Sequence, residues 1–177
     1  LRAMSCIHST YGLRLVGWIG DVPSDLDLNL FCDADFAGDQ VTQRSTSGVH
    51  LAPQGPRSIF PLHGVSKRQT AVAFSTPEAE LVAGCYGYMK VMLPALDLWD
   101  VIVPELRPPL FHEDNQAMIM VVSSGRSPTM RHIGRVHRVS LQWLHGRLGK
   151  YGGRDAAILY YESTENMSAD IYTKPFN

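Results

Sequence analysis

The chain of 177 residues lacks the features that mark several classes of protein. Its three cysteines, Cys6, Cys32 and Cys85, lie far apart in apolar contexts and form no CxxC pair. Neither a disulfide framework nor a zinc site of paired cysteines is indicated, and buried thiols in a reducing compartment are expected. No apolar run approaches the roughly 20 residues of a membrane span, and no signal peptide is visible. We therefore expect an intracellular protein that does not bind a membrane.

Charged residues are few, at 19%, and their signs are unevenly distributed although the formal net charge is -1. Acids are missing between residues 115 and 154, a stretch with seven of the 16 Lys and Arg and with His132, His137 and His145. Six of the 17 acids lie between residues 21 and 39. An acidic focus followed by a basic stretch suits a polyanion handled by bound metal, and uneven surface decoration is the alternative.

The pattern of apolar residues, which with Cys, Trp and Tyr make up 45% of the chain, predicts one α/β domain. Strands are expected at residues 13–19, 27–33, 49–52, 109–113 and 156–161. Residues 58–62 and 69–74 are expected to form one further hairpin partner with an interruption between them. Helices are expected at 1–12, from 75 onward with a kink or an end at Pro94, and at 114–125, 133–148 and 163–174. The strands between residues 27 and 74 are expected to form an antiparallel meander. Strand 27–33 is expected to lie parallel to strand 109–113.

Two of these strands end in acidic residues. The run LNLFCDADFAG at Leu28–Gly38 ends in Asp33 and Asp35, and PLFHEDN at Pro109–Asn115 ends in Glu113 and Asp114. The carboxyl ends of adjacent parallel strands meet at one edge of the sheet, which is where open α/β sheets place their sites. The sequence therefore predicts a shared carboxylate site.

The candidate cluster takes one acid from each of four segments, namely Asp33, Glu80, Asp114 and Asp170. Such carboxylates would repel one another, and hard divalent cations such as Mg²⁺ or Mn²⁺ remove that penalty. Two such ions can activate a water and stabilise the leaving oxygen of a phosphodiester. For any one of these acids the alternative is a solvated or helix-capping residue, and Asp114 is placed to be an N-cap.

Four stretches resemble a known family: CDADFAGDQVTQRSTSG, KRQTAVAFSTPEAEL, EDNQAMI and ADIYTKPF. In this order they are similar to the signature of the RNase H domain of Ty1/copia retrotransposon Pol polyproteins. The similarity covers about Gly12 to Phe176. The chain departs from the family pattern at Glu113, which stands for a cysteine, at Phe36, which stands for a tryptophan, and at Gly134, where an acid is usual.

The resemblance implies an RNase H-like fold, with a five-stranded mixed sheet and helices on both faces, and an endoribonuclease that degrades the RNA strand of RNA–DNA hybrids with two Mg²⁺, or Mn²⁺. Asp33 would bridge both ions, Glu80 and Asp114 would hold one, and Asp170 the other. Asp35 and Glu78 would lie behind these ligands or at the surface.

The same resemblance makes residues 1–12 the tail of a preceding reverse transcriptase region and 13–177 the RNase H domain. The reverse transcriptase would be a partner in the same polyprotein, in a cytoplasmic virus-like particle with a possible nuclear phase. One alternative is a catalytically decayed module that binds hybrid or supports the polymerase. A DNA-strand transferase of similar fold is disfavoured, because the chain has no amino-terminal HHCC segment.

Several polar residues are candidates for substrate contact. They are Arg44, Ser45, Ser47, Lys67, Arg68, Asn115, Gln116, Arg131, His132 and His137. Basic side chains among them would contact backbone phosphates and read duplex form rather than sequence. A solvated surface is the alternative for each basic residue. For the two histidines, product release or phosphate contact stands against a partly buried or surface histidine.

Overall fold

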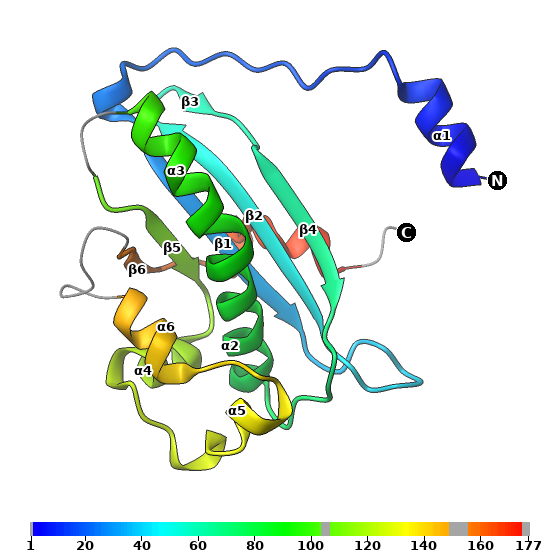
Figure 1. The fold of residues 1–177 in the computed structure, drawn as a ribbon, viewed down its shortest axis with the longest axis vertical. Coiled ribbons are helices and arrows are strands. Elements are labelled where there is room, and N and C mark those ends of the chain that lie inside the picture. Colours follow the sequence, from blue (N-terminus) through cyan, green and yellow to red (C-terminus); the bar gives the residue numbers. More distant parts are fainter. Residues whose placement is uncertain (1, 104–106, 149–155, 175–177) are drawn as a thin grey trace.

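The sheet is organised around β1 (Asp27–Asp35), the strand that ends in the first acidic motif. The structure, a computed structural model, describes residues 2–103, 107–148 and 156–174. The other strands are β2 (Thr46–Gly55), β3 (Ser58–Ile59), β4 (His63–Arg68), β5 (Leu110–Glu113) and β6 (Ile158–Tyr161). They are ordered β3-β2-β1-β5-β6, with β4 also paired to β2 (Figure 1). The predicted α/β class and mixed sheet are confirmed.

Pairing within the sheet follows the predicted topology. β1 runs antiparallel to β2, β2 is antiparallel to both β3 and β4, and β1 is parallel to β5. β5 is in turn parallel to β6. The carboxyl ends of β1 and β5 therefore lie side by side at one edge, which is the arrangement that the two acidic strand ends require.

The helices are α1 (Arg2–Thr10), α2 (Thr76–Gly87), α3 (Leu93–Ile102), α4 (Gln116–Ser124), α5 (Ile133–Val136) and α6 (Leu141–Arg147). A π-helical turn, η2 (Tyr88–Met92), joins α2 to α3, and 3₁₀ turns occupy η1 (Pro23–Asp25), η3 (Pro128–Met130), η4 (Thr164–Asn166) and η5 (Ser168–Tyr172). In Figure 1, α2 and α3 cross the front of the sheet, whereas α1 stands apart from it.

The two faces of β1 pack against different partners because successive side chains of a strand alternate. Leu28, Leu30 and Cys32 belong to the main core, which α2, α4 and α6 cover. Phe31 lies on the other face and packs with Met167 and Ala169 beside η5. In the described part of the chain, this second face is covered by the 3₁₀ turn η5. The helix expected at 163–174 is thus present only as two short 3₁₀ helices, η4 and η5, and η5 is the helical element on this face.

The third strand of the expected meander differs in position from the strands that the structure shows. The expected strand at 69–74 is absent, the strand expected at 58–62 is only β3, and β4 begins at His63, inside the segment read as an interruption. The sheet thus has six strands where five were expected. Residues after Gln69 leave the sheet so that Ala73 can pack with Ala34, Ala79 and Ala83 under α2.

Other expectations differ in detail. Residues 13–19 form no strand, and their apolar side chains are exposed, for example Val16 at 84% and Trp18 at 83%. The segment lies beside Phe60 at the end of the edge strand β3, but it forms no ladder with it. Pro94 does not end its helix, because the wider π turn η2 precedes it and accommodates the missing N–H. The expected helix 133–148 is divided at Arg138, whose φ is 58°.

The close packing of η5 on the sheet at Gly48 can be tested by substitution. It pairs with Asp33, and a Cβ there would lie 2.6 Å from the Ala169 carbonyl oxygen and 2.7 Å from Thr173 Cγ2. Because one of these atoms belongs to the backbone, we expect Gly48→Ala to lower the free energy of unfolding by about 1–3 kcal/mol in urea denaturation. Gly146→Ala is the control, since no atom lies within 4 Å of its Cβ position. Equal effects of the two changes would contradict this packing.

Candidate functional site

A cavity of about 400 Å³ lies at the carboxyl ends of β1 and β5. All four predicted metal ligands line it, from four different elements: Asp33, Glu80, Asp114 and Asp170. Asp35, one of the acids expected behind the ligands or at the surface, and Asn115, a substrate candidate, also line this acidic cavity. Residues distant in the sequence are therefore brought to one place by the parallel pairing of β1 with β5.

Three of the four acids lie close enough together to share a cation. Asp33, Glu80 and Asp114 each offer one carboxylate oxygen, and these oxygens lie within 4.8 Å of one another. Asp170 lines the same cavity but forms an ion pair with Lys174. Asp170, the fourth predicted ligand, therefore lines the cavity, but its carboxylate is already paired with the Lys174 ammonium group.

Asp33 is held in place by the C-terminal segment. Thr173 Oγ1 donates a hydrogen bond of 2.6 Å to Asp33 Oδ2, across the close approach of η5 to the sheet. Burial raises the pKa of Asp33, the Thr173 hydrogen bond opposes this, and the charges of Asp170 and Asp114 raise it further. Thr173 also lines the acidic cavity, and it was not among the residues predicted for the site although it lies inside the ADIYTKPF stretch.

Glu80 is the most perturbed acid of the three. Burial, followed by the charges of Glu113 and Asp33, raises its pKa to about 11. Glu80 Oε2 is buried and has no hydrogen-bond partner. A carboxylate in such a position is stabilised by a proton or by a cation.

Glu113 is fully buried next to these acids. Its Oε1 accepts a hydrogen bond from the Asn115 backbone N–H, and its Oε2 has no partner. Burial raises its pKa well above the usual range, as do the charges of Asp114 and Asp33. Glu113, which stands where the resembled family has a cysteine, thus places a carboxyl group in the core.

The donor set of this cavity fits a hard divalent cation. It consists of carboxylate oxygens, which are the ligands that Mg²⁺ and Mn²⁺ prefer, and it contains no thiol or imidazole. The unpartnered oxygen of Glu80 is the clearest sign of this fit, because a buried anionic oxygen without a donor is costly. Asp33, Glu80 and Asp114 can therefore hold a metal ion.

Glu78 lies two residues before Glu80 and makes different contacts. It is 1% exposed, and its Oε1 accepts hydrogen bonds from His132 Nε2 at 3.0 Å and His137 Nε2 at 2.9 Å. The two histidines flank α5, so these bonds attach the basic segment to the first turn of α2. Both of them contact Glu78, and neither lines the acidic cavity. For both histidines, the geometry favours the alternative of a partly buried residue over phosphate contact or product release.

The contribution of this contact to stability can be measured. We expect His137→Ala to lower the free energy of unfolding by about 2–3 kcal/mol, because it leaves a cavity and deprives a buried carboxylate of a donor. His132→Ala is the matched control, with a smaller expected loss because its side chain is 34% exposed. Urea denaturation at neutral pH measures both, and equal losses would contradict the assigned burial.

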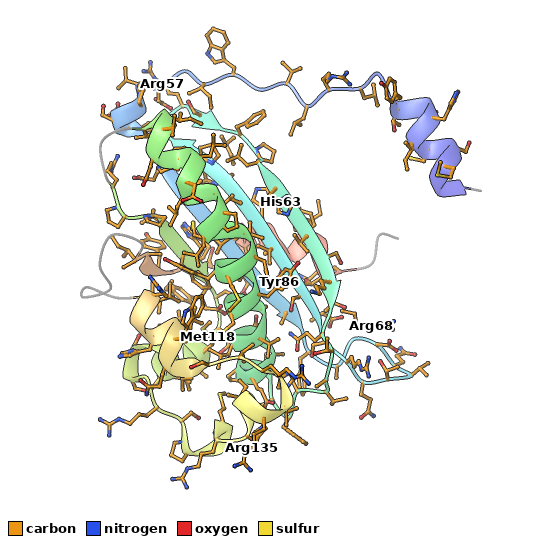
Figure 2. All side chains as sticks on the ribbon, viewed as in Figure 1. Arg57, His63, Arg68, Tyr86, Met118 and Arg135 are labelled. Carbon is orange, nitrogen blue, oxygen red and sulfur yellow. The ribbon has the colours of Figure 1, made fainter. Side chains whose placement is uncertain are left out.

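The remaining substrate candidates are dispersed. Ser45 is buried and accepts a hydrogen bond from the Ala37 backbone N–H, while Arg44 and Gln116 are exposed. Ser47, Lys67, Arg68 and His137 line a second pocket between β4 and α2, which also contains Tyr86. Figure 2 shows Tyr86 on α2 and Arg68 near the end of β4.

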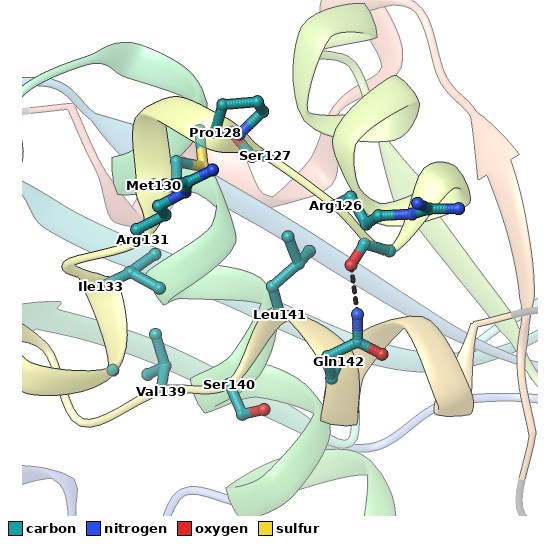
Figure 3. A pocket seen from close by; sticks show the side chains of 12 residues that line it. Arg126, Ser127, Pro128, Met130, Arg131, Ile133, Val139, Ser140, Leu141 and Gln142 are labelled. Atoms are coloured by element: carbon teal, nitrogen blue, oxygen red, sulfur yellow. Dashed lines mark hydrogen bonds between the residues drawn. The ribbon is translucent and has the colours of Figure 1, made fainter.

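Arg131 lies in a third hollow, of about 470 Å³, between the end of α4 and the start of α6 (Figure 3). Its lining is largely apolar, and Gln142 Nε2 closes one side by donating to the Gly125 carbonyl. The ten substrate candidates therefore do not form one surface patch.

No family model matches the chain, and no solved structure matches it. Within the described ranges, no helix has the length and apolar content to span a bilayer.

Proposed function

We propose that the protein is a divalent-cation-dependent ribonuclease H that cleaves the RNA strand of RNA–DNA hybrids. The single observation that carries the proposal is the acidic cavity, where four acids named from separated sequence motifs meet at adjacent strand ends. Three of them approach within 4.8 Å, as shared cation ligands must. An RNase H-like fold agrees with the mixed sheet and with the position of the cavity.

The roles of the individual acids are those that the motif resemblance implies. When bound, two Mg²⁺ or Mn²⁺ ions would activate a water and stabilise the leaving oxygen of the phosphodiester. By the motif resemblance, Asp33 would be a ligand of both ions, Glu80 and Asp114 would hold one of them, and Asp170 would hold the other. Because Asp170 is paired with Lys174, this last role requires the lysine to turn away.

The wider setting is also part of the proposal and rests on the motif resemblance. It assigns residues 13–177 to an RNase H domain that follows a reverse transcriptase region in a Ty1/copia-type Pol polyprotein. Such a polyprotein works in a cytoplasmic virus-like particle. The partner would be the hybrid formed during reverse transcription.

The direct test is cleavage of an end-labelled RNA–DNA hybrid by the purified chain. We expect RNA-strand cleavage with Mg²⁺ or Mn²⁺, none with EDTA, and no cleavage of double-stranded DNA of the same sequence. Equal cleavage with EDTA, or preference for DNA, would contradict the proposal.

A second candidate is a catalytically decayed module that binds hybrid without cutting it. Two observations favour it: Lys174 is paired with Asp170, and Glu113 adds a buried acid where the family has a cysteine. Saturable hybrid binding without turnover in either cation would support this second candidate.

A further inference from the structure

The second pocket lies on the α2 face of the sheet and has a volume of about 200 Å³. Its lining residues come from β2, β4, α2, the π turn η2 and the turn after α5. Four of them are basic, namely Lys67, Arg68, Lys90 and Arg138, and none is an Asp or Glu. Such a lining favours an anionic ligand.

Two buried polar atoms of the lining residues have no hydrogen-bond partner among the residues that the structure describes. Gln69 Nε2 donates to Ser47 Oγ at 3.0 Å and to the Ala79 carbonyl at 2.9 Å, which leaves Gln69 Oε1 without a donor. His137 Nε2 is engaged by Glu78, which leaves Nδ1, on the other side of the ring, without a partner. Gln69 is 5% exposed and His137 is 7% exposed. Buried groups of this kind are normally satisfied, so a bound group with a hydroxyl donor would complete this wall.

Lys67 is a basic residue of the pocket whose side chain is held in place by a contact. Lys67 Nζ lies 4.3 Å from the centre of the Tyr86 ring, a cation–π contact that fixes the lysine over α2. Arg138 has a φ of 58°, a left-handed conformation that is unfavourable for a residue with a Cβ and marks a constrained position. Arg68 is also paired with Asp39 at 2.6 Å, so it contributes less free charge.

We propose that this pocket binds one sugar–phosphate unit of a nucleic-acid strand. The phosphate lies among Lys67, Lys90 and Arg138, and a ribose 2′-hydroxyl, which an RNA strand has and a DNA strand lacks, donates to Gln69 Oε1 or His137 Nδ1 after a small side-chain rotation. Tyr86 and Met89 supply an apolar wall for the sugar. The inference deepens the proposed function and rests on it for the identity of the strand.

The position of the pocket fits this role. Ala34 of β1 pairs with Ser47 of β2, and Ser47 pairs with Lys67 of β4, at the same edge of the sheet as the acidic cavity. Two strand spacings separate the backbones of Ala34 and Lys67, or about 10 Å. A strand gripped in the pocket therefore lies near the edge of the sheet that holds the acidic cavity.

The test uses the full chain in EDTA, so that the acidic cavity holds no cation. The probes are inorganic phosphate, the tetranucleotide dT4 and its ribose counterpart rU4, titrated while NMR follows the Gln69 side-chain amide and the His137 ring. We expect both signals to shift with rU4, whose ribose has the 2′-hydroxyl donor, and to shift less with dT4, which lacks it. Lys67→Gln and Arg138→Asn should each weaken the Kd about tenfold, as loss of a charge-assisted hydrogen bond does. Asn is chosen at position 138 because it tolerates the left-handed conformation.

Arg126→Asn is the matched control, because this exposed arginine lies in the same basic segment but outside the pocket. It should leave the Kd unchanged. Equal weakening by all three variants, or no shift at Gln69 and His137 with any probe, would overturn the inference. Binding of inorganic phosphate but not of either tetranucleotide would overturn the strand assignment. Failure of hybrid cleavage with these shifts intact would contradict the proposed function alone.

Discussion

Asp114→Asn will abolish Mg²⁺-dependent cleavage of an RNA–DNA hybrid while the fold remains intact. Asp114 is only partly buried, and Thr164 Oγ1 donates to its Oδ2 at 2.8 Å, a contact that the asparagine carbonyl can keep. The change removes one anionic ligand of the three that lie within 4.8 Å. Loss of several kcal/mol of charge stabilisation corresponds to a fall in kcat of about 10³-fold or more.

The measurement is single-turnover cleavage of a labelled hybrid, with circular dichroism and thermal unfolding recorded for the same preparations. Asp97→Asn is the control, because Asp97 is an exposed acid on α3 that does not line the acidic cavity. It should cleave at the unmodified rate. Unchanged cleavage by Asp114→Asn would show that the metal site takes no part in cleavage.

Without divalent cations, the protein will become less stable as the pH rises from 5 to 9, and Glu80 will carry a large part of this effect. Its pKa is about 11 in the folded state, well above the value near 4.3 of an unfolded chain. The folded state therefore binds more protons than the unfolded state between these values. The stabilisation is complete below pH 4.3 and is lost as the pH rises toward 11.

Urea denaturation in EDTA at pH 5, 7 and 9 measures this dependence. One group contributes a slope of at most about 1.4 kcal/mol per pH unit. We expect Glu80→Gln to reduce the slope, because the amide cannot lose a proton, while Asp33 and Glu113 retain part of it through their own raised pKa values. Saturating Mg²⁺ should also flatten the profile of the unmodified protein, because the cation stabilises the ionised carboxylates.

Glu165→Gln provides the control for that experiment, since Glu165 is an exposed acid in η4. It should leave the pH profile unchanged. A slope that is the same in Glu80→Gln as in the unmodified protein would mean that the buried position of Glu80 has been assigned wrongly.

The errors of sequence reading have one physical origin, the absence of information about neighbours. Residues 13–19 alternate as a strand does, yet they form no strand in the structure, although Gly17 lies against Phe60 at the end of the edge strand β3. Residues 69–74 are equally strand-like, but Ala73 leaves the sheet to pack under α2. Local periodicity describes which faces are apolar, and tertiary contacts select what covers them.

The helix ends were more predictable because their signals are local. Ser75 accepts a hydrogen bond from the Glu78 backbone N–H, Asn115 accepts one from Met118, and Gly125 ends α4 with a φ of 66°. The terminal segment 163–174 contains a capping signal as well, but forms 3₁₀ turns. There the close approach of η5 to Gly48 decides the backbone path.

The acidic strand end LNLFCDADFAG by itself determined that a carboxylate site would lie at a sheet edge, because a buried strand that ends in acids requires compensation. The choice of acids came from the motifs. Only the tertiary structure decided the rest: that Asp33, Glu80 and Asp114 approach within 4.8 Å, that Lys174 is paired with Asp170, and that His132 and His137 contact Glu78. These are contacts between residues distant in the sequence, and no local pattern encodes such distances.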